Sequence, residues 1–245
     1  VISPENLVKQ AVSCGMDHLC LADINNTSGI IELTRYCHEN GLRPIAGIEF
    51  RNGDTWLYTG IAKDHTGLYH LNSFLSHYRL NKEPLPSQPP VLEGVIFVFP
   101  QGTAEPRALR SNEYIGVGLP EINKIVGREY PAFASNLMAF HPVTFLKQED
   151  QEVHRHLRAI DHNCLLTRLQ EKWLASGSEF FYCPDYLKEK FQHYPDLIDN
   201  AEIIQNLPGL NFGRDIKNKQ TFTGSRKKDR ELLEKLACEG MKERY

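Results

Sequence analysis

Apolar runs alternate with amphipathic helical segments in the first half of the chain. Ser3 and Pro4 are the residue types preferred at the N-cap and first position of a helix, and Gly15 ends that helix. An apolar run then ends at Asp23, and after a second helical segment a similar run ends at Glu49. This order of strand, helix and strand predicts a parallel β-α-β unit.

The same alternation continues to about residue 146. The predicted strands are residues 19–23, 44–49, 55–62, 94–99, 114–117 and 137–140, and the predicted helices are residues 4–14, 30–40, 68–78 and 120–125. Prolines between residues 81 and 90 exclude a regular helix there and predict an extended segment. The pattern therefore predicts an α/β fold.

Helical segments dominate the rest of the chain. The predicted helices are residues 151–160, 184–191 and 195–205, followed by a charged helix from residue 225. One apolar stripe follows this last helix and consists of Leu232, Leu233, Leu236, Ala237 and Met241. We expect a boundary near residues 207–218, because the stripe has no obvious partner within so short a tail.

Length and composition favour one large domain with a short extension. Of the 245 residues, 41% are hydrophobic and 24% are charged, values close to globular averages. The net charge of -3 argues against a surface built mainly to bind nucleic acid. The sequence contains no P-loop, nucleophile elbow or polymerase aspartate pair.

The six cysteines form no C-x-x-C pair. Cys20 lies in an apolar strand, where a reduced, buried thiol is expected. Together with the lack of an apolar run long enough to cross a membrane, this cysteine usage predicts a cytoplasmic protein without membrane contact.

Carboxylates end two successive predicted strands, at Asp23 and Glu49. The C-terminal ends of strands in α/β folds meet at one rim, where such folds place their chemistry. A metal site is therefore the first hypothesis, and His141 could add one nitrogen. The alternative is that the carboxylates cap a loop or pair with a nearby cation, and that His141 is structural.

With their spacing, these two strand ends resemble the PHP (polymerase and histidinol phosphatase) domain that begins bacterial DNA polymerase III alpha subunits. The positions in step with that domain are Gly29, Arg43, Pro44, Ile45, Gly47 and Glu49. Residues 57–75, residues 154–160 and residues 181–200 match further, and residues 232–245 resemble the start of the polymerase region.

The resemblance implies a distorted (β/α)7 barrel followed by a helical extension. The PHP domain would cover residues 1–206, with the barrel ending near residue 146, and residues 207–245 would form a basic linker and the first helix of the polymerase body. Val1 already falls in the loop before the first helix. The first strand of the barrel is therefore expected to be missing from this sequence.

The metal motifs implied by the resemblance are incomplete. A competent site takes His-x-His from the first strand, an Asp-His pair, a glutamate and a late Asp-x-His. Here Ile24 replaces the first histidine of the pair, while Pro142 and Thr144 replace the late aspartate and histidine. Isoleucine and proline cannot bind a cation, and a threonine hydroxyl is a poor ligand for zinc or manganese.

Asp23, Glu49 and His141 thus remain as vestigial candidates, and neither a catalytic residue nor a cofactor is predicted. Zinc or manganese would be expected only if the site is intact after all. His154 and His156 imitate the missing motif, but two residues apart on a helix they point about 200° away from each other. They cannot bind the same ion.

One basic segment lies near the C-terminus. Its candidate nucleic-acid-binding residues are Lys217, Lys219, Arg226, Lys227 and Lys228. Contact with a phosphate backbone is one interpretation. A solvated linker is the other, because Asp215 and Asp229 dilute the charge.

The resemblance implies replicative DNA synthesis for the parent protein, a DNA-directed DNA polymerase, and no activity for this part alone. It implies a structural scaffold whose partners are the rest of the alpha subunit, the proofreading exonuclease subunit in some members, and DNA in the full-length protein. An active metal-dependent phosphoesterase or proofreading nuclease is the main alternative. A stand-alone DNA-binding module is the third, which the negative net charge opposes.

Overall fold

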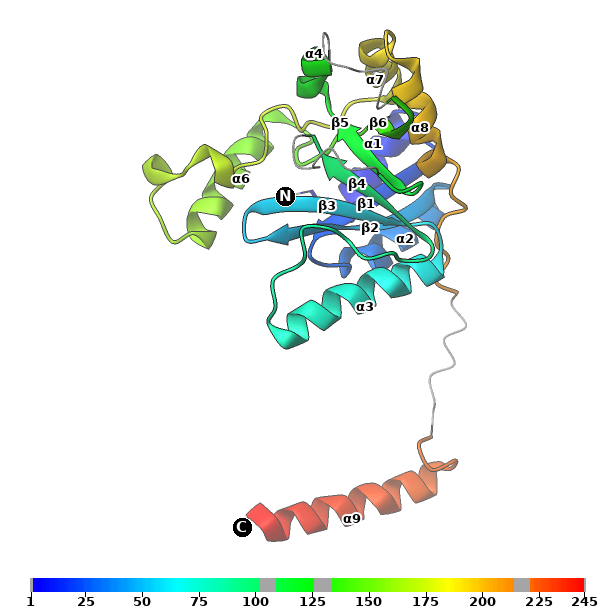
Figure 1. Cartoon of the computed structure of the whole chain (residues 1–245). Helices are drawn as coiled ribbons and strands as arrows, with labels where there is room; N and C mark the ends of the chain where they lie inside the picture. Colours follow the sequence, from blue (N-terminus) through cyan, green and yellow to red (C-terminus); the bar gives the residue numbers. More distant parts are fainter. Residues whose placement is uncertain (1, 102–108, 126–133, 214–220, 245) are drawn as a thin grey trace. The chain divides into compact units, whose positions relative to one another are not determined.

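The computed structural model describes residues 2–101, 109–125, 134–213 and 221–244 (Figure 1). They fall into two compact units, Val1–Asn211 and Phe212–Tyr245. This division lies within the segment where the sequence predicts a boundary.

The first unit is built on one sheet with the strand order β1-β2-β3-β4-β5-β6. The strands are β1 His18–Ile24, β2 Arg43–Asn52, β3 Thr55–Ala62, β4 Val95–Pro100, β5 Glu113–Val117 and β6 Leu137–Ala139. They match the predicted strands closely. The six described strands and the helices around them confirm the prediction of an α/β, barrel-like fold.

Strand direction follows from how the strands are connected. β1 and β2 are parallel, as the β-α-β pattern predicts, and β4, β5 and β6 are parallel to one another. β3 is antiparallel to both β2 and β4. A tight turn at Gly53, whose φ is 58°, joins β2 to β3, and so short a connection can link only antiparallel strands. The sheet is therefore mixed.

The helices of the first unit agree equally well with the sequence pattern. They are α1 Pro4–Ser13, α2 Gly29–Glu39, α3 His65–Asn81, α4 Ile122–Ile125, α6 Gln148–Asp161, α7 Pro184–Phe191 and α8 Pro195–Gln205. α6 begins three residues earlier than predicted. The reason is Asp150, whose carboxylate accepts hydrogen bonds from the backbone N–H groups of Leu146 and Lys147.

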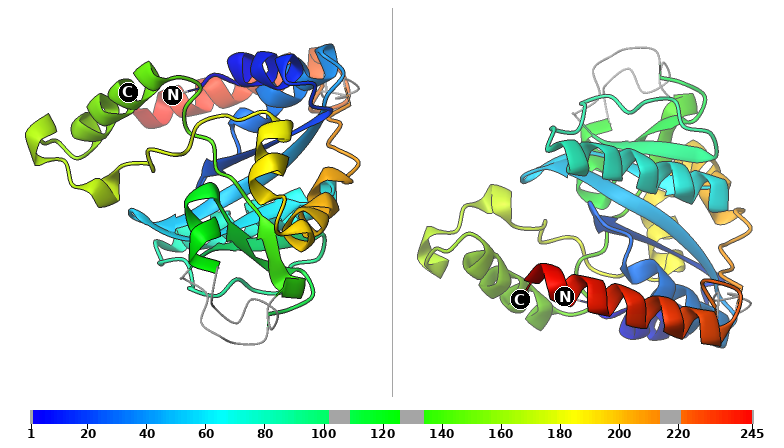
Figure 2. Two further views of the ribbon diagram at one scale, coloured as in Figure 1. Left: turned by 90° about the horizontal axis from the view of Figure 1, so that it is seen from above. Right: turned by 90° about the horizontal axis from the view of Figure 1, so that it is seen from below.

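The sheet has an interior face and an outer face. Buried side chains of the interior face form one cluster: Ile45, Ile61, Ile96, Val98, Tyr114, Met138 and, from the segment after α8, Leu207. Helices α2, α3 and α8 cover the outer face, where Phe50 packs against Phe74 of α3 at 5.3 Å between ring centroids (Figures 1 and 2). Side chains alternate along each strand, so one set points into the barrel interior and the other set contacts the helices.

The N-terminus of α3 is fixed against the loop before β4. The carboxylate of Asp64 accepts a hydrogen bond of 2.8 Å from the N–H of Gly67 and caps the helix. A Cβ atom at Gly67 would lie 2.0 Å from the carbonyl oxygen of Gly94. Only glycine permits this approach, so the start of α3 packs backbone against backbone.

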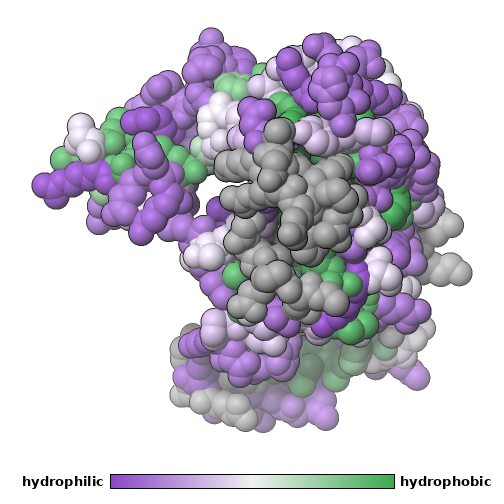
Figure 3. All heavy atoms as spheres, turned by 45° about the horizontal axis from the view of Figure 1, so that its top comes forward, coloured by the Kyte–Doolittle hydropathy of each residue, from purple (hydrophilic) through white to green (hydrophobic). Residues whose placement is uncertain are grey.

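A projecting segment of residues 146–178 contains α6 (Figure 1). Its base is a parallel bridge between Phe145 and Phe180. Within it, Arg158 donates to the carbonyl oxygen of Trp173 and forms an ion pair with Asp54 in the β2–β3 turn. Exposed apolar side chains of α6 are Val153, Leu157 and Ile160, and Figure 3 shows apolar atoms on this segment.

The second unit contains α9, Arg226–Arg244, as the sequence predicts. Its first turn is stabilised by Asp229, whose carboxylate accepts hydrogen bonds from the N–H groups of Phe222 and Thr223. Leu233, Leu236 and Met241 of the apolar stripe are 57–68% exposed. None of the described helices is long and apolar enough to cross a membrane.

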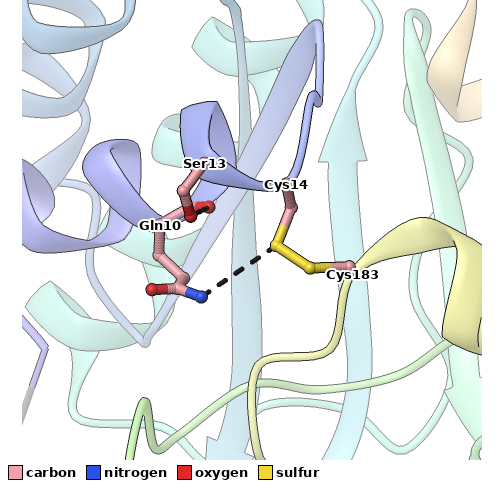
Figure 4. Close-up of a disulfide and its surroundings, with 4 residues drawn as sticks. All are labelled: Gln10, Ser13, Cys14 and Cys183. Carbon is pink, nitrogen blue, oxygen red and sulfur yellow. Dashed lines mark hydrogen bonds between the residues drawn. A yellow bond between two sulfur atoms is a disulfide. The ribbon is translucent and has the colours of Figure 1, made fainter.

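A disulfide joins Cys14 at the end of α1 to Cys183 at the start of α7 (Figure 4). The sequence pattern did not predict it, because the two residues are 169 positions apart. The other described cysteines are free thiols. Cys20 is a free thiol as expected but only partly buried, and burial raises its pKa to about 12.

Replacing Cys14 and Cys183 by serine is expected to lower the free energy of unfolding by about 2–4 kcal/mol, because the cross-link restricts a long loop of the unfolded chain. Urea unfolding of oxidised protein measures the change. Cys238→Ser, at an exposed free thiol, is the matched control and should have no effect. Equal stability of the double variant and the oxidised protein would contradict a formed disulfide.

Candidate functional site

The C-terminal ends of the parallel strands and the start of β3 share one rim of the sheet. This rim carries Asp23, Glu49 and the segment that follows β6. The strand register then decides which of these side chains can meet.

Asp23 faces the helices outside the barrel. Its register partner on β2 is the fully buried Ile48, and its carboxylate accepts a hydrogen bond from the backbone N–H of Gly29, the first residue of α2. Burial raises the pKa of Asp23, and the hydrogen bond from Gly29 opposes this rise. A Cβ at Gly29 would lie 2.7 Å from Asp23 Oδ2. Asp23 therefore caps a helix.

Glu49 lies on the interior face, with Ile24 as its register partner on β1. Arg51, on the same strand, donates a hydrogen bond from Nε to Glu49 Oε1. The carboxylate side chain is only 14% exposed, and burial raises its pKa even though the Arg51 charge acts to lower it. Asp23 and Glu49 lie on adjacent parallel strands as predicted, but one residue out of register, on opposite faces.

His141 follows β6 and is held by the segment after the projecting loop. Its Nε2 donates a hydrogen bond of 2.9 Å to the carbonyl oxygen of Phe180, and its ring packs 5.2 Å from that of Tyr182. Nδ1 is buried and has no hydrogen-bond partner among the described residues. Burial lowers the pKa of His141 and favours the neutral ring.

Sequence reasoning missed Glu179. Its Oε2 accepts a hydrogen bond of 2.5 Å from the hydroxyl of Thr144, and its Oε1 accepts one of 2.8 Å from the N–H of Ser176. Its charge acts on both Glu49 and His141. The only sequence signal was its place two residues before Phe181 and Tyr182, which resemble the PHP pattern.

A pocket of about 140 Å³ opens at this rim, next to the interior face. Its walls include Trp56 from β3, Phe140 and His141 after β6, and the carboxylates of Glu121 and Glu179. Asp23 and Glu49 are not among its lining residues. Of the three vestigial candidates, only His141 reaches the pocket.

The described residues do not fit a catalytic metal cluster. Among them, no group of three or more His, Cys, Asp or Glu side chains is placed to hold an ion. Ile24 occupies the interior position beside Glu49, and the hydroxyl of Thr144 is engaged with Glu179. The donor set is therefore too small for the multinuclear sites that activate water.

His154 and His156 are separated as helix geometry requires. His154 Nε2 accepts a hydrogen bond of 3.1 Å from the N–H of Ala175, and its ring packs against Phe145. His156 is exposed, and its Nδ1 lies 2.7 Å from the carbonyl oxygen of Glu152. Both contacts hold the projecting segment together.

The basic candidates lie in the second unit. Lys217 and Lys219 are outside the described residues. Arg226, Lys227 and Lys228 form the exposed first turn of α9. Backbone N–H groups at a helix N-terminus favour anions, but the carboxylate of Asp229, which accepts hydrogen bonds from the N–H groups of Phe222 and Thr223, adds a negative charge to this turn.

A family model described as "PHP domain" matches residues 1–241. The chain belongs to the PHP domain family. The match covers the sheet, the helical extension and most of α9, which agrees with the resemblance seen at the strand ends.

The similar proteins are DNA polymerases. DNA polymerase III subunit alpha of Buchnera aphidicola is 24% identical over 82% of this chain and 21% of its own length. The same subunit of Streptococcus pyogenes serotype M3 is 22% identical over the whole chain and 23% of its own length. An error-prone DNA polymerase of Symbiobacterium thermophilum is 32% identical over 33% of the chain and 7% of its own length.

The chain thus spans roughly a fifth of the length of the alpha subunits that it matches. The likeness covers their PHP region.

Metal analysis is expected to detect no multinuclear cluster in this PHP domain, because Ile24, Pro142 and Thr144 cannot complete one. Emission spectrometry on protein purified without chelator measures the metal content. Glu49→Gln removes the interior carboxylate, whereas Asp23→Asn changes the helix cap and serves as control. Several equivalents of zinc, manganese or iron, lost in Glu49→Gln but kept in Asp23→Asn, would contradict the prediction.

Stability is expected to fall as the pH rises from the ordinary pKa of Glu49 through its raised value in the folded protein. Over that range the folded state keeps a proton that the unfolded chain has released, so rising pH favours unfolding. Urea unfolding across the range should show a smaller fall in Glu49→Gln, and no difference in Glu32→Gln, an exposed control. A metal bound at Glu49 would lower its pKa and reverse the sign.

Proposed function

We propose that this PHP domain is the N-terminal region of a DNA polymerase III alpha subunit and serves replicative DNA synthesis as a structural scaffold without phosphoesterase activity of its own. The names and coverage of the similar proteins support the first part. The side chains at the rim support the second. The parent protein would be the DNA-directed DNA polymerase, and its remaining length the principal partner.

The observation that carries the proposal is the position of Ile24. On the interior face it is the register partner of Glu49, so an apolar side chain occupies the place beside the one interior carboxylate of β2. Glu49 is instead neutralised by Arg51. A phosphoester needs cations at such a site, and here the local cation is already paired with protein.

Two exposed apolar surfaces support a scaffold role. On α9, Leu233, Leu236 and Met241 are largely exposed, and on α6 the exposed residues are Val153, Leu157 and Ile160. Burying apolar surface contributes about 25 cal/mol per Å², so several such side chains supply a few kcal/mol on docking. The α9 stripe would pack against the polymerase body. A surface of the domain would dock the proofreading exonuclease.

DNA would be a partner of the full-length protein rather than of this domain. Arg226, Lys227 and Lys228 are exposed and could contact a phosphate backbone there.

A cytoplasmic location is part of the proposal. The Cys14–Cys183 disulfide is unusual for that compartment, which makes its redox state in the cell a direct check.

Hydrolysis assays separate the scaffold from its main alternative, a metal-dependent phosphoesterase or proofreading nuclease. The 245-residue chain is incubated with manganese or zinc and either bis(p-nitrophenyl) phosphate or a primer with a mismatched 3′ end. We expect rates no higher than those of Glu49→Gln, because the rim lacks the ligands for a metal-activated water.

The matched control is Glu32→Gln, whose side chain is exposed on α2. A rate for the unmodified chain that Glu32→Gln retains and Glu49→Gln loses would establish the phosphoesterase and refute the scaffold proposal. A rate shared by all three proteins would come from a contaminant, and the absence of activity in this domain would stand.

A further inference from the structure

The Cys14–Cys183 disulfide joins parts of the chain that belong to opposite edges of the sheet (Figure 4). Cys14 follows α1, which packs on α2 and contacts β1, one edge strand of the described sheet. Cys183 precedes α7, which packs on α8, the helix that covers β6 at the other edge. Among the described strands, β1 and β6 do not pair with each other. The disulfide therefore links the two edges of the sheet covalently.

The disulfide also ends a short stretch of residues 179–182, here called the rim segment, which is hydrogen-bonded to the rim. The N–H of Phe181 donates a hydrogen bond of 2.8 Å to the carbonyl oxygen of Phe145, whose own N–H donates one of 3.0 Å to the carbonyl oxygen of Glu179. Cys183 follows directly in the chain. The rim segment is therefore held to the rim by hydrogen bonds and to α1 by a covalent bond.

Other contacts hold α7 and α8 to the sheet without any sulfur atom. Phe191 of α7 and Leu197 of α8 are buried in one cluster with Val117 and Leu137. The side-chain amide of Asn200 donates a hydrogen bond of 2.6 Å to the carbonyl oxygen of Leu137. The described contacts between α1 and α7 themselves are few. Reduction of the disulfide therefore releases the rim segment from α1 and leaves the core in place.

The bonded cysteines are accessible, in contrast to the buried thiol of Cys37. Cys183 is exposed and Cys14 is half-buried, so a small thiol in solution can reach the pair. Exposed disulfides belong to the labile and regulatory class. Burial raises the pKa of the Cys37 thiol to about 11, which disfavours the reactive thiolate there. The bond between Cys14 and Cys183 can consequently break selectively.

The folded backbone also allows the bond to form again. The Cα atoms of Cys14 and Cys183 are 5.2 Å apart, within the usual range for a disulfide. Because the cluster around Phe191 and Leu197 keeps α7 on the sheet, the two reduced cysteines stay close to each other. Formation of the bond therefore needs no refolding of the chain.

We propose that Cys14 and Cys183 form a reversible thiol–disulfide switch that sets how firmly the rim segment is held on the rim. In the oxidised state the bond ties the rim segment to α1, and in the reduced state only its hydrogen bonds and neighbouring contacts hold it. Disulfides of cytoplasmic proteins are usually transient or redox-sensing. The switch rests on the cytoplasmic location in the proposed function and goes beyond the scaffold role, since it gives the rim two states.

The oxidant is a small disulfide of the glutathione type, which reacts in two exchange steps. The thiolate of the exposed Cys183 attacks one sulfur of the small disulfide, whose S–S bond breaks and releases one small thiol. The thiolate of Cys14 then attacks Sγ of Cys183, which forms the protein disulfide and releases the second small thiol. Two electrons pass from the cysteine pair to the small disulfide, and the two cysteine protons end on the released thiols. Reduction is the reverse reaction.

The redox equilibrium is measured on the full 245-residue chain in buffers that differ in their ratio of reduced to oxidised glutathione. After acid quenching and alkylation, peptide mass spectrometry gives the fraction of protein with Cys14 bonded to Cys183. We expect the same fraction from reduced and from oxidised starting protein, and a lower fraction as reduced glutathione increases. A bond that persists in excess reduced glutathione, or fails to form in excess oxidised glutathione, overturns the switch.

Hydrogen exchange shows whether the bond controls the rim segment. The amide of Phe181 should exchange about tenfold faster in the reduced protein, because local opening is no longer restrained by the cross-link. The amide of Phe97, bonded to the carbonyl oxygen of Asn112, is the internal reference and should not change. Equal exchange of Phe181 in the two redox states would show a disulfide without a switch and overturn the proposal.

Cysteine variants assign the effect to this pair. Cys14→Ser should show the fast exchange of the reduced protein in both redox buffers. Cys238→Ser, at an exposed free thiol of the second unit, is the matched control and should keep the difference between the buffers. A redox difference that survives in Cys14→Ser would come from another thiol and contradict the proposal. Neither readout uses phosphoester hydrolysis, so the switch and the lack of phosphoesterase activity can fail separately.

Discussion

The register between β1 and β2 is the constraint on which the rim depends. A strand places successive side chains on opposite faces, so Ile24 rather than Asp23 shares the interior with Glu49. Asp23 instead caps α2 through the N–H of Gly29. One residue of offset thus places the two carboxylates on opposite faces of the sheet, where Asp23 caps a helix and Glu49 is a buried acid.

The same constraint explains the electrostatics of the rim. Glu49 is buried beside an isoleucine, so its pKa is raised, and Arg51 provides the opposite charge from the same strand. The acceptors that line the pocket come from other strand ends and from the segment after the projecting helix. There the carboxylate of Glu179 is held by hydrogen bonds from the hydroxyl of Thr144 and the N–H of Ser176.

Long-range contacts hold the helical extension to the barrel. Cys14 and Cys183 connect α1 to α7, Asn200 of α8 donates to the carbonyl oxygen of Leu137 on β6, and Arg158 reaches Asp54. These contacts place the segment with Phe180 against His141 and Glu179 against Thr144. The pocket depends on this extension as much as on the sheet.

The sequence by itself determined the elements and their order, because apolar periodicity, helix caps and glycine stops act over a few residues. Strand 55–62 and helices 184–191 and 195–205 were predicted to the residue. It also determined that Ile24 and Pro142 cannot bind a metal, since this follows from residue type. Only the tertiary structure decided the face of Asp23, the Cys14–Cys183 pairing and the pocket of Gln101, His141 and Glu179. Each of these depends on which distant segments meet, and no local pattern in the chain records that meeting.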